Sequence, residues 1–414
     1  MLFSYKKIFW ISVTLLIISS KDILGVAAVS NINADKSTTL TDSGILTPIV
    51  PPPKLNAEAY VLMDYESGEV ITGHNIHEHR PPASLTKMMT AYVVYSMLST
   101  GQFTKNDKVL ISKNAWKTRG STMFLEAGEK VSVLNLLKGL IVVSGNDAAV
   151  ALAEYVAGSE EGFVQLMNTT AQQMGLKDTN FEDANGLPDK DHYSSAYDQA
   201  KIAWHTIHDY PEYYPLYSIK EFQHGTDKKT GEPLAPQTNR ITLLWSDKYV
   251  DGLKTGHTES AGYCLAISSK RDNRRLIAVI LNAPNSRSRD IEAQKLLAYG
   301  YRFFSTVKPV TANKTLKTVQ VWKGDSAELS VSSAADVWVT VPRSEESKVT
   351  ASVVLDEDKI IAPVNKGQKV GNINILLNGK VLKTAPAIAE KAINKGGFFR
   401  RFWDSIRLFF SNLF

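Results

Sequence analysis

The stretch Pro81-Pro82-Ala83-Ser84-Leu85-Thr86-Lys87-Met88-Met89-Thr90-Ala91-Tyr92-Val93-Val94 places a hydroxyl and an amine at the start of a long apolar run. Proline is favoured in the first turn of a helix, and the apolar run that follows predicts a buried helix. Ser84 and Lys87 are three residues apart, which is nearly one helical turn, so their side chains share one face. The stretch therefore predicts a serine nucleophile beside an amine that can take its proton.

Two further strings supply the rest of this chemistry. Ser144-Gly145-Asn146 provides a second hydroxyl near a side-chain amide, and Lys254-Thr255-Gly256 provides a basic strand edge that ends in glycine. Taken in this order, the three strings are the components of acyl transfer by a serine nucleophile with a lysine base.

Other copies of the first string are excluded by their context. Ser4–Lys7 falls in a basic N-terminal segment, and Ser305–Lys308 is followed by Pro309. Because the residue before a proline disfavours the helical region, no helix is expected to continue at Ser305–Lys308. Ser84 is therefore the predicted nucleophile.

The Lys-Thr-Gly string also occurs twice. Lys229 lies in a polar stretch rich in glycine and proline, which predicts a loop. Lys254 is followed by two apolar runs, Tyr263–Ile267 and Leu276–Leu281, joined by a polar turn, which predicts a β-meander. Since a binding edge belongs on a strand, Lys254 is the predicted site residue.

The order of elements predicts an α+β domain. Ala57–Asp64 and Glu69–Thr72 alternate around a turn and predict a hairpin. Helices are expected at Val131–Val143, Ala148–Ala157, Glu161–Met174 and Ser288–Phe304. An early hairpin, a helical insert and a late meander imply an antiparallel sheet closed by distant segments, with helices packed against it. We assign residues 54–306 to this serine acyl-transfer domain.

A small all-β domain is expected at residues 307–391. From Lys308 onward the chain shows short alternating runs at regular spacing, separated by turns. The runs are Val319–Trp322, Val337–Val341, Thr350–Val354 and Asn372–Leu377. No catalytic cluster is found in this segment.

Residues 396–414 predict an amphipathic helix. Its apolar face consists of Phe399, Phe402, Trp403, Ile406, Phe409, Phe410 and Leu413, and the opposite side is polar except for Leu408. This pattern is typical of a helix that lies in a membrane surface. The alternative is a helix that docks on the all-β domain.

The N-terminus predicts export. Two lysines precede a short apolar run that ends near small residues, so residues 1–28 are expected to be a signal peptide. The alternative is an uncleaved anchor. Residues 29–53 are rich in Ser, Thr, Asn and Pro and predict a linker. The single cysteine, Cys264, excludes an internal disulfide and is expected to be a buried apolar residue.

Composition also limits the partners. The net charge of +5 is mild, and no basic stripe is interleaved with aromatic residues, so nucleic acid is not an expected partner. The histidines before Pro81 lack a cysteine or a fourth ligand, so no metal is expected, and no cofactor is implied.

These features resemble the low-molecular-mass penicillin-binding proteins, specifically the membrane-anchored D-alanyl-D-alanine carboxypeptidases. The resemblance extends from about Ala57 to the C-terminus. It rests on Pro82–Lys87, Ser144–Ala148, Tyr193–Ala196 and Asp251–Thr258, together with the all-β domain and the tail. It implies a penicilloyl-serine-transferase (β-lactamase-like) fold for the first domain.

The resemblance also implies catalytic roles. Ser84 attacks the carbonyl between two terminal D-Ala residues, and an unprotonated Lys87 is the acylation base. Ser144, helped by Lys254, relays the proton to the leaving amine.

Binding roles are implied in the same way. Asn146 holds the substrate amide, and Thr255 with Lys254 receives the terminal carboxylate. Gly256 lets the substrate backbone lie close, and the N–H groups of Ser84 and His257 form the oxyanion hole. Arg240 resembles a family arginine that helps to bind the carboxylate.

The expected function is a serine D-Ala-D-Ala carboxypeptidase that trims peptidoglycan stem peptides and is acylated by β-lactams. The alternative is a D,D-endopeptidase that cuts cross-links on the same fold. A β-lactamase is disfavoured because no Glu-x-x-Leu-Asn segment follows Asn146. The intact set of site residues argues against an inactive wall-binding protein.

The expected location is the periplasmic face of the cytoplasmic (inner) membrane, with peripheral contact through the C-terminal helix. One departure concerns Asn185-Gly186-Leu187, where close relatives often carry His-Gly-Leu. Because that segment borders the site, the departure is expected to affect the deacylation rate and the fine specificity.

Overall fold

The structure is a computed structural model that describes residues 50–227 and 229–411. The predicted signal peptide, most of the predicted linker, and Leu413 of the tail lie outside the described residues.

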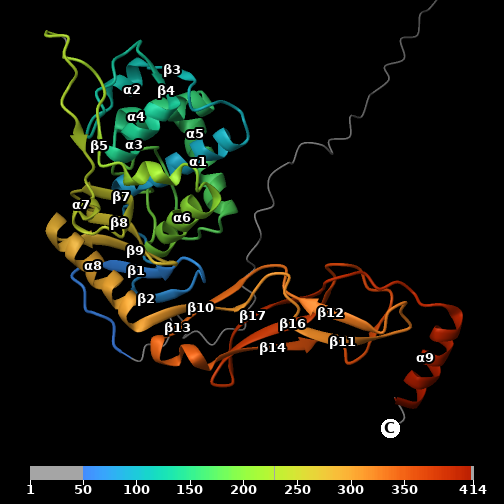
Figure 1. The fold of residues 1–414 in the computed structure, drawn as a ribbon. Helices are drawn as coiled ribbons and strands as arrows, with labels where there is room; N and C mark the ends of the chain where they lie inside the picture. Colours follow the sequence, from blue (N-terminus) through green and yellow to red (C-terminus); the bar gives the residue numbers. More distant parts are fainter. Residues whose placement is uncertain (1–49, 228, 412–414) are drawn as a thin grey trace, which may run out of the picture. The chain divides into compact units, whose positions relative to one another are not determined.

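The first domain is built on a five-stranded antiparallel sheet in the order β2-β1-β9-β8-β7 (Figure 1). Its strands are β1 (Ala59–Asp64), β2 (Val70–His74), β7 (Val250–Thr258), β8 (Gly262–Arg271) and β9 (Arg274–Ala283). The predicted hairpin and meander are therefore confirmed. β1 pairs directly with β9, which closes the sheet between segments far apart in the sequence.

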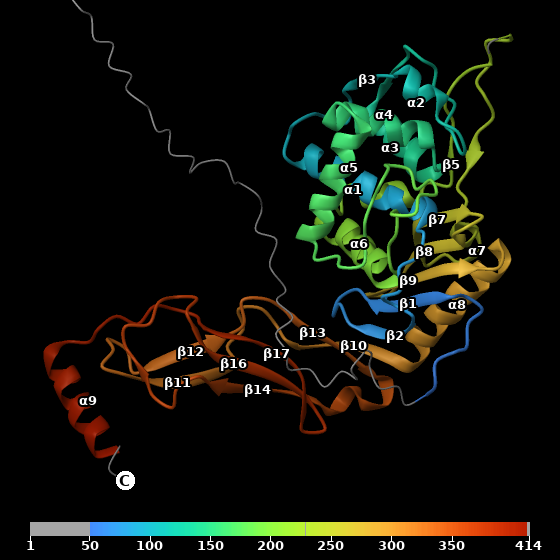
Figure 2. The ribbon, with the colours of Figure 1, turned by 180° about the vertical axis from the view of Figure 1, so that it is seen from behind.

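Alternation along the strands gives the sheet two buried faces. Val61 and Met63 of β1 belong to a core shared with the helical part, whereas Tyr60 and Leu62 belong to a second core. The second core is covered by α8 (Ser286–Phe303). Successive strand residues point to opposite faces, so this division follows from the period of two. Figures 1 and 2 show α8 along one side of the sheet, and α1 (Thr86–Ser99) and α6 (Ala196–Asp209) on the other side.

The helical part forms around α1 (Thr86–Ser99), which is buried over most of its circumference. The other helices are α2 (Lys113–Lys117), α3 (Val133–Val142), α4 (Asn146–Ala157), α5 (Glu160–Gln173), α6 (Ala196–Asp209) and the short α7 (Leu243–Ser246). The short strands β3 (Lys108–Leu110) and β4 (Lys130–Ser132) pair, as do β5 (Glu221–Phe222) and β6 (Gln237–Thr238). The helix expected from Val131 begins two residues later, because the Ser132 side chain caps it by accepting a hydrogen bond from the N–H of Asn135.

The C-terminal segment is all-β, as predicted. Its six-stranded sheet has the order β14-β16-β17-β12-β11-β15, and β10 (Phe304–Val310) pairs with β13 (Val337–Pro342) beside it. The strands of the larger sheet are β11 (Lys317–Trp322), β12 (Glu328–Ser332), β14 (Val349–Leu355), β15 (Ile360–Ile361), β16 (Lys369–Leu377) and β17 (Lys380–Ala389). This segment has its own apolar core, which includes Leu329, Val339 and Ile373.

β17 was not anticipated, because Pro386 interrupts its pattern and proline is normally excluded from central strands. In the structure Pro386 lies opposite Asn372 of β16. On its other side β17 pairs with β12 only at Ile388 and Ala389. Pro386 therefore occupies a stretch of β17 with one neighbouring strand, where a missing N–H is tolerated.

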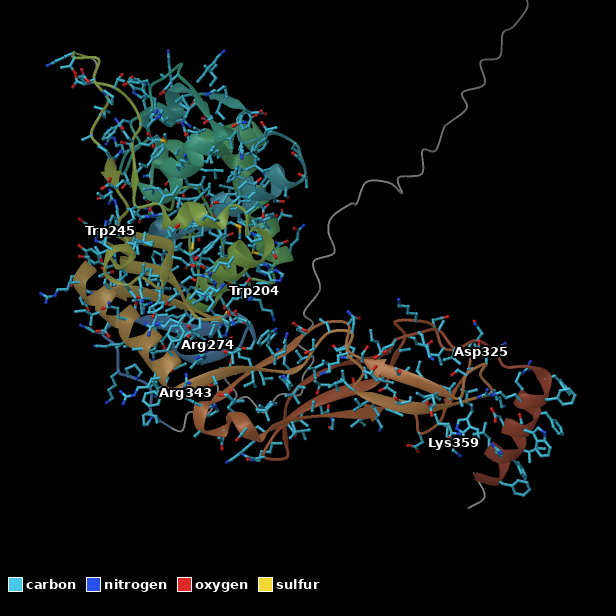
Figure 3. All side chains as sticks on the ribbon, viewed as in Figure 1. Trp204, Trp245, Arg274, Asp325, Arg343 and Lys359 are labelled. Carbon is cyan, nitrogen blue, oxygen red and sulfur yellow. The ribbon has the colours of Figure 1, made fainter. Side chains whose placement is uncertain are left out.

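Hydrogen bonds join the turn between β1 and β2 to the C-terminal sheet residues. Ser67 Oγ lies 2.7 Å from Thr340 Oγ1, and Lys383 Nζ donates to the main-chain oxygen of Ser67 at 3.1 Å. Arg274, labelled in Figure 3, donates to Thr306 Oγ1 at 2.7 Å. β10 spans the boundary predicted between residues 306 and 307, and the division into domains stays a prediction.

The predicted C-terminal helix is α9 (Phe398–Ser411). Its polar side contacts the all-β segment: Asp404 accepts a hydrogen bond from the N–H of Lys323 at 2.6 Å, and Arg400 donates to the main-chain oxygen of Asp325 at 3.3 Å. Leu408, the apolar residue on the polar side, is buried. Because residues 400, 404 and 408 share one helical face, Leu408 belongs to this docking side.

The opposite side of α9 is exposed. Phe398, Phe399, Phe402, Trp403, Phe409 and Phe410 are each more than half exposed. Within residues 50–227 and 229–411, no helix has the length and apolar character needed to cross a membrane.

Candidate active site

Ser84 lies in a 3₁₀ turn, Ala83–Leu85, that leads directly into α1. Lys87 lies in the first turn of α1, and its Nζ donates to Ser84 Oγ at 2.9 Å. The predicted sharing of one face is therefore confirmed, because residues three apart eclipse in a 3₁₀ turn. Ala83 has φ 48°, a left-handed conformation that non-glycine residues rarely adopt. Such strain is common at functional sites.

Lys87 is buried, and its Nζ also donates to the main-chain oxygen of Asn185 at 2.5 Å. Burial lowers the pKa of Lys87 to about 7. The positive charge of Arg240 contributes to this lowering, whereas Asp183 and Asp147 oppose it. An amine with this pKa is largely neutral slightly above pH 7, as a proton acceptor for Ser84 requires.

The segment Asn185-Gly186-Leu187 was expected to border the site, but its main-chain contact with Lys87 and the role of Asp183 were not predicted. The Asp183 carboxylate accepts hydrogen bonds from the N–H groups of Asn185, Gly186 and Leu187 at 2.8, 2.5 and 3.0 Å. A Cβ on Gly186, whose φ is 87°, would lie 1.9 Å from the main-chain oxygen of Ala83. Glycine is therefore needed for the loop to pack on the serine turn. An aspartate shortly before Asn-Gly is a turn signal that could have revealed this loop.

His192 contacts the start of α1, next to Lys87. Its Nε2 lies 2.8 Å from Thr86 Oγ1, and its Nδ1 accepts from the N–H of Glu182 at 3.3 Å. Because Nδ1 is an acceptor, the ring proton is assigned to Nε2, which donates to Thr86. Burial lowers the pKa of His192 and favours this neutral form.

Ser144 lies at the junction between α3 and α4 and is buried with φ 61°. The adjoining start of α4 is anchored to a neighbouring segment. Asn146 Nδ2 donates to the main-chain oxygen of Arg119 at 2.6 Å, and the Asp147 carboxylate accepts from the N–H groups of Met123 and Leu125. The negative charge of Asp147 also acts on Lys87, whose pKa it raises against the effect of burial.

Lys254 and Thr255 lie on β7, the strand at the edge of the sheet. Lys254 is buried, and its Nζ donates to the main-chain oxygen of Thr255 at 2.9 Å. Burial lowers the pKa of Lys254, and the nearby charges of Lys87 and Arg240 lower it further. Lys87, Arg240 and Lys254 are therefore within electrostatic reach of one another, and a bound carboxylate would relieve their mutual repulsion.

The free edge of β7 faces the serine turn. A Cβ on Gly256 would lie 2.9 Å from the main-chain oxygen of Pro82 and 3.2 Å from the main-chain nitrogen of Ser84. Glycine thus permits the close approach of strand and turn. The next residue, His257, is exposed, and its ring lies 4.0 Å from that of Tyr263.

The second Lys-Thr-Gly copy is in a turn, as predicted. Asp227 Oδ1 accepts from the N–H groups of Lys229 and Thr230 at 2.8 and 3.0 Å, and Lys229 is exposed. Ser305 lies on strand β10, so Ser305–Lys308 is not helical either. Ser4–Lys7 lies outside the described residues. Within the part of the chain that the structure describes, no group of three or more His, Cys, Asp or Glu residues is placed to hold a metal.

Comparisons with known proteins agree with this arrangement. Residues 47–285 match the D-alanyl-D-alanine carboxypeptidase family, and residues 304–395 match the C-terminal domain of penicillin-binding protein 5. D-alanyl-D-alanine carboxypeptidase DacC of Escherichia coli is 43% identical over 88% of this chain and 91% of its own length. DacF of Bacillus subtilis is 35% identical over 83% of this chain and 87% of its own length.

Solved structures give the same result. Penicillin-binding protein 5 from Haemophilus influenzae superposes with a TM-score of 0.79 and 42% identity, covering 84% of this chain and 100% of that chain. The expected α+β domain, followed by a β-rich C-terminal domain, is confirmed. The chain belongs to the D-alanyl-D-alanine carboxypeptidase family of serine peptidases, in the group of penicillin-binding protein 5.

Proposed function

We propose that this chain removes the C-terminal D-alanine from peptides ending in D-Ala-D-Ala through an acyl-enzyme on Ser84. The observation that carries the proposal is the 2.9 Å hydrogen bond from buried Lys87 Nζ to Ser84 Oγ. Release of free D-alanine from a synthetic peptide with this ending, by the purified chain, is the test. If the folded chain releases none, the proposal is wrong.

Acylation begins when Ser84 Oγ attacks the carbonyl carbon between the two D-Ala residues. Neutral Lys87 takes the hydroxyl proton as the carbon–oxygen bond forms. The N–H groups of Ser84 and His257 stabilise the oxyanion, and the closeness of Gly256 to the Ser84 nitrogen supports this assignment.

Collapse of the intermediate breaks the carbon–nitrogen bond. Protonated Lys87 passes the proton from Ser84 through Ser144 to the leaving amine, so Lys87 becomes neutral again, free D-alanine departs and the shortened peptide stays esterified to Ser84. Water then hydrolyses the ester, with Lys87 again as the proton acceptor. β-Lactams acylate Ser84 by the same attack on their ring carbonyl.

The terminal carboxylate binds where Lys254, Thr255 and Arg240 present positive charge and a hydroxyl. Asn146 donates its amide to the acyl part of the substrate. Burial is the main cause of the lowered pKa values of Lys87 and Lys254, and the positive charge of Arg240 contributes to both, which supports placing Arg240 near the two lysines. A carboxylate is therefore the complementary ligand.

The two Lys-Thr-Gly copies give a matched test of this carboxylate site. Lys254→Ala is expected to lower kcat/KM for D-alanine release by about 150-fold, corresponding to about 3 kcal/mol of transition-state binding. Lys229→Ala is expected to leave it unchanged, because Lys229 lies in an exposed turn. The two variants are compared in steady-state assays. Similar losses in both would contradict the assignment.

We further propose that the chain is exported and acts at the periplasmic face of the inner membrane, held there by α9. The support is the exposed row of aromatic side chains on α9, whose opposite side is docked. Exposed Arg401 and Arg407 each add roughly 1 kcal/mol toward anionic lipid. Each aromatic side chain that enters the membrane contributes at most roughly 1.5–3 kcal/mol to binding when it is fully buried there, and less at interfacial depth.

A chain ending at Asn394 is therefore expected to lose binding to anionic vesicles while still releasing D-alanine from small peptides. Cosedimentation of the full-length and truncated chains with vesicles measures the difference. Two sets of substitutions in α9 of the full-length chain test the same point without shortening the chain. Phe402→Ser combined with Trp403→Ser removes exposed aromatic side chains, whereas Leu408→Ser alters the docked side. Equal sedimentation of full-length and truncated chains would place the anchor elsewhere.

A further inference from the structure

His192 is a buried titratable residue beside the proposed active site that the reaction steps above do not use. Its side chain is 1% exposed, and the ring of Phe181 packs edge-on against it with the ring centres 5.7 Å apart. Nε2 lies 2.8 Å from Thr86 Oγ1, and Nδ1 accepts a hydrogen bond from the N–H of Glu182 at 3.3 Å. Both ring nitrogens are therefore used, and the neutral ring with its proton on Nε2 is the form that fits both contacts.

These contacts link the two segments that hold Lys87. Thr86 directly precedes Lys87 in the first turn of α1, so one nitrogen of the His192 ring contacts the helix that carries the amine. The other nitrogen accepts from Glu182, which lies shortly before Asn185 in the sequence. The main-chain oxygen of Asn185 accepts a hydrogen bond from Lys87 Nζ at 2.5 Å. The ring therefore connects the start of the helix to the segment that leads into the loop.

Protonation of His192 is incompatible with this arrangement. A proton on Nδ1 turns that nitrogen into a donor, and it then faces the N–H of Glu182, which is also a donor. Asp183 Oδ1, 3.8 Å from Nδ1, is a carboxylate oxygen within reach of the new donor. The same oxygen already accepts from the N–H groups of Asn185 and Gly186. An imidazolium that pairs with Asp183 therefore competes with the hydrogen bonds that shape the loop.

The environment of the ring keeps it neutral until the solution becomes acidic. Burial is the largest influence and lowers the pKa of His192 from its ordinary value. The negative charges of Asp183, Glu182 and Asp189 oppose this lowering, whereas the positive charge of Lys87 adds to it. Because Lys87 and His192 disfavour each other's charge, acid protonates the two groups as interacting sites rather than independently.

We propose that neutral His192 is a positioning residue for Lys87. In acid the imidazolium of His192 draws Asp183 away from the N–H groups of the loop, and the loop then releases the amine of Lys87. Acylation therefore requires two neutral groups: Lys87, which accepts the proton of Ser84, and His192, which keeps Lys87 in place. This inference rests on the proposed function of the same site, and it adds a response to acid that Lys87 alone does not give.

The pH dependence of acylation by a penicillin measures how many groups must be neutral. Stopped-flow rates are recorded on the full-length chain from about pH 4 to about pH 9, with circular dichroism at each pH to establish that the protein is folded. Below the pKa values of both groups, the wild-type rate is expected to fall about 100-fold per pH unit, because each required neutral group contributes about tenfold. A limiting fall of only about tenfold per pH unit would overturn the proposal.

The variant His192→Gln separates hydrogen bonding from titration. Its amide can donate to Thr86 and accept from the N–H of Glu182, but it does not take up a proton in this pH range. We expect the wild-type rate at about pH 8 and a fall of about tenfold per pH unit in acid. His208→Gln, which changes an exposed histidine in the last turn of α6, is the matched control and is expected to keep the wild-type profile. Equal acid slopes in wild-type and folded His192→Gln protein would overturn the role of His192.

The variant His192→Leu tests the positioning role while the ring of the wild-type protein is neutral. It leaves Thr86 and the N–H of Glu182 without this partner, so the acylation rate at about pH 8 is expected to fall about fivefold or more, whereas His192→Gln is expected to restore it. Wild-type acylation by folded His192→Leu protein would overturn the positioning role. D-Alanine release by the wild-type chain is measured at the same pH values. If release persists, the failure of these variants leaves the proposed function standing, and its absence at every pH would overturn both.

Discussion

Replacing Ser84 by alanine is expected to abolish D-alanine release, with a loss on the order of 10⁴-fold or more in kcat/KM. Without Oγ no acyl-enzyme forms, and the remaining groups can only bind the substrate. The fold should persist, because alanine suits the short 3₁₀ turn that carries Ser84. A coupled assay for free D-alanine, run beside thermal melting, separates lost chemistry from lost structure.

Ser305→Ala is the matched control for this variant. Ser305 is the first residue of another Ser-x-x-Lys string, but it lies on β10, where no helical turn brings a lysine beside it. Wild-type activity is therefore expected. Substantial D-alanine release by folded Ser84→Ala protein, or its loss in Ser305→Ala, would show that the nucleophile has been assigned wrongly.

Replacing Lys87 by arginine is expected to suppress acylation almost as completely. A guanidinium keeps a positive charge but does not deprotonate in proteins, so it cannot accept the proton of Ser84. The larger group must also fit where Lys87 is enclosed by Ser84 Oγ and the main-chain oxygen of Asn185. Stopped-flow measurement of β-lactam acylation reports this step directly.

The pH profile of the wild-type chain tests the same role without a substitution. Burial lowers the pKa of Lys87 to about 7, so the neutral amine predominates above that pH and the ammonium below it. The acylation rate is therefore expected to rise through pH 7 and to level off at higher pH. A flat profile from pH 5 to 9, or rapid acylation of the Arg variant, would require a different base.

The sequence was sufficient where local pattern and chemistry coincide. Ser84 and Lys87 could be paired because the proline pair and the apolar run specify a helix start between them. Lys254 could be separated from Lys229 because one copy leads into alternating apolar runs and the other lies among turn residues. The sheet could also be predicted from local pattern, since apolar and polar residues alternate with a period of two in both the hairpin and the meander.

The rest depends on contacts between distant segments. The loop that follows Asp183 contacts Lys87 through the main-chain oxygen of Asn185. Because every residue has a main-chain oxygen, the sequence does not reveal which one accepts this hydrogen bond. The left-handed φ of Ala83 could not be predicted from the sequence either, because alanine rarely adopts it. In the structure Ala83 packs closely against Gly186 and Gly256, two residues far away in the sequence. β17 was missed because proline is normally excluded from central strands. Pro386 is tolerated in β17 since β12 does not pair with β17 at that residue, and this pairing cannot be read from the sequence.

The most direct measurement is the mapping of a penicillin adduct on the folded wild-type chain. The protein is incubated with a penicillin, digested and sequenced by tandem mass spectrometry. We predict one covalent adduct, on the peptide that contains Ser84, and its absence from Ser84→Ala protein treated in the same way. An adduct on Ser144, Ser305 or any other residue, or no adduct on folded protein, would contradict acylation at Ser84.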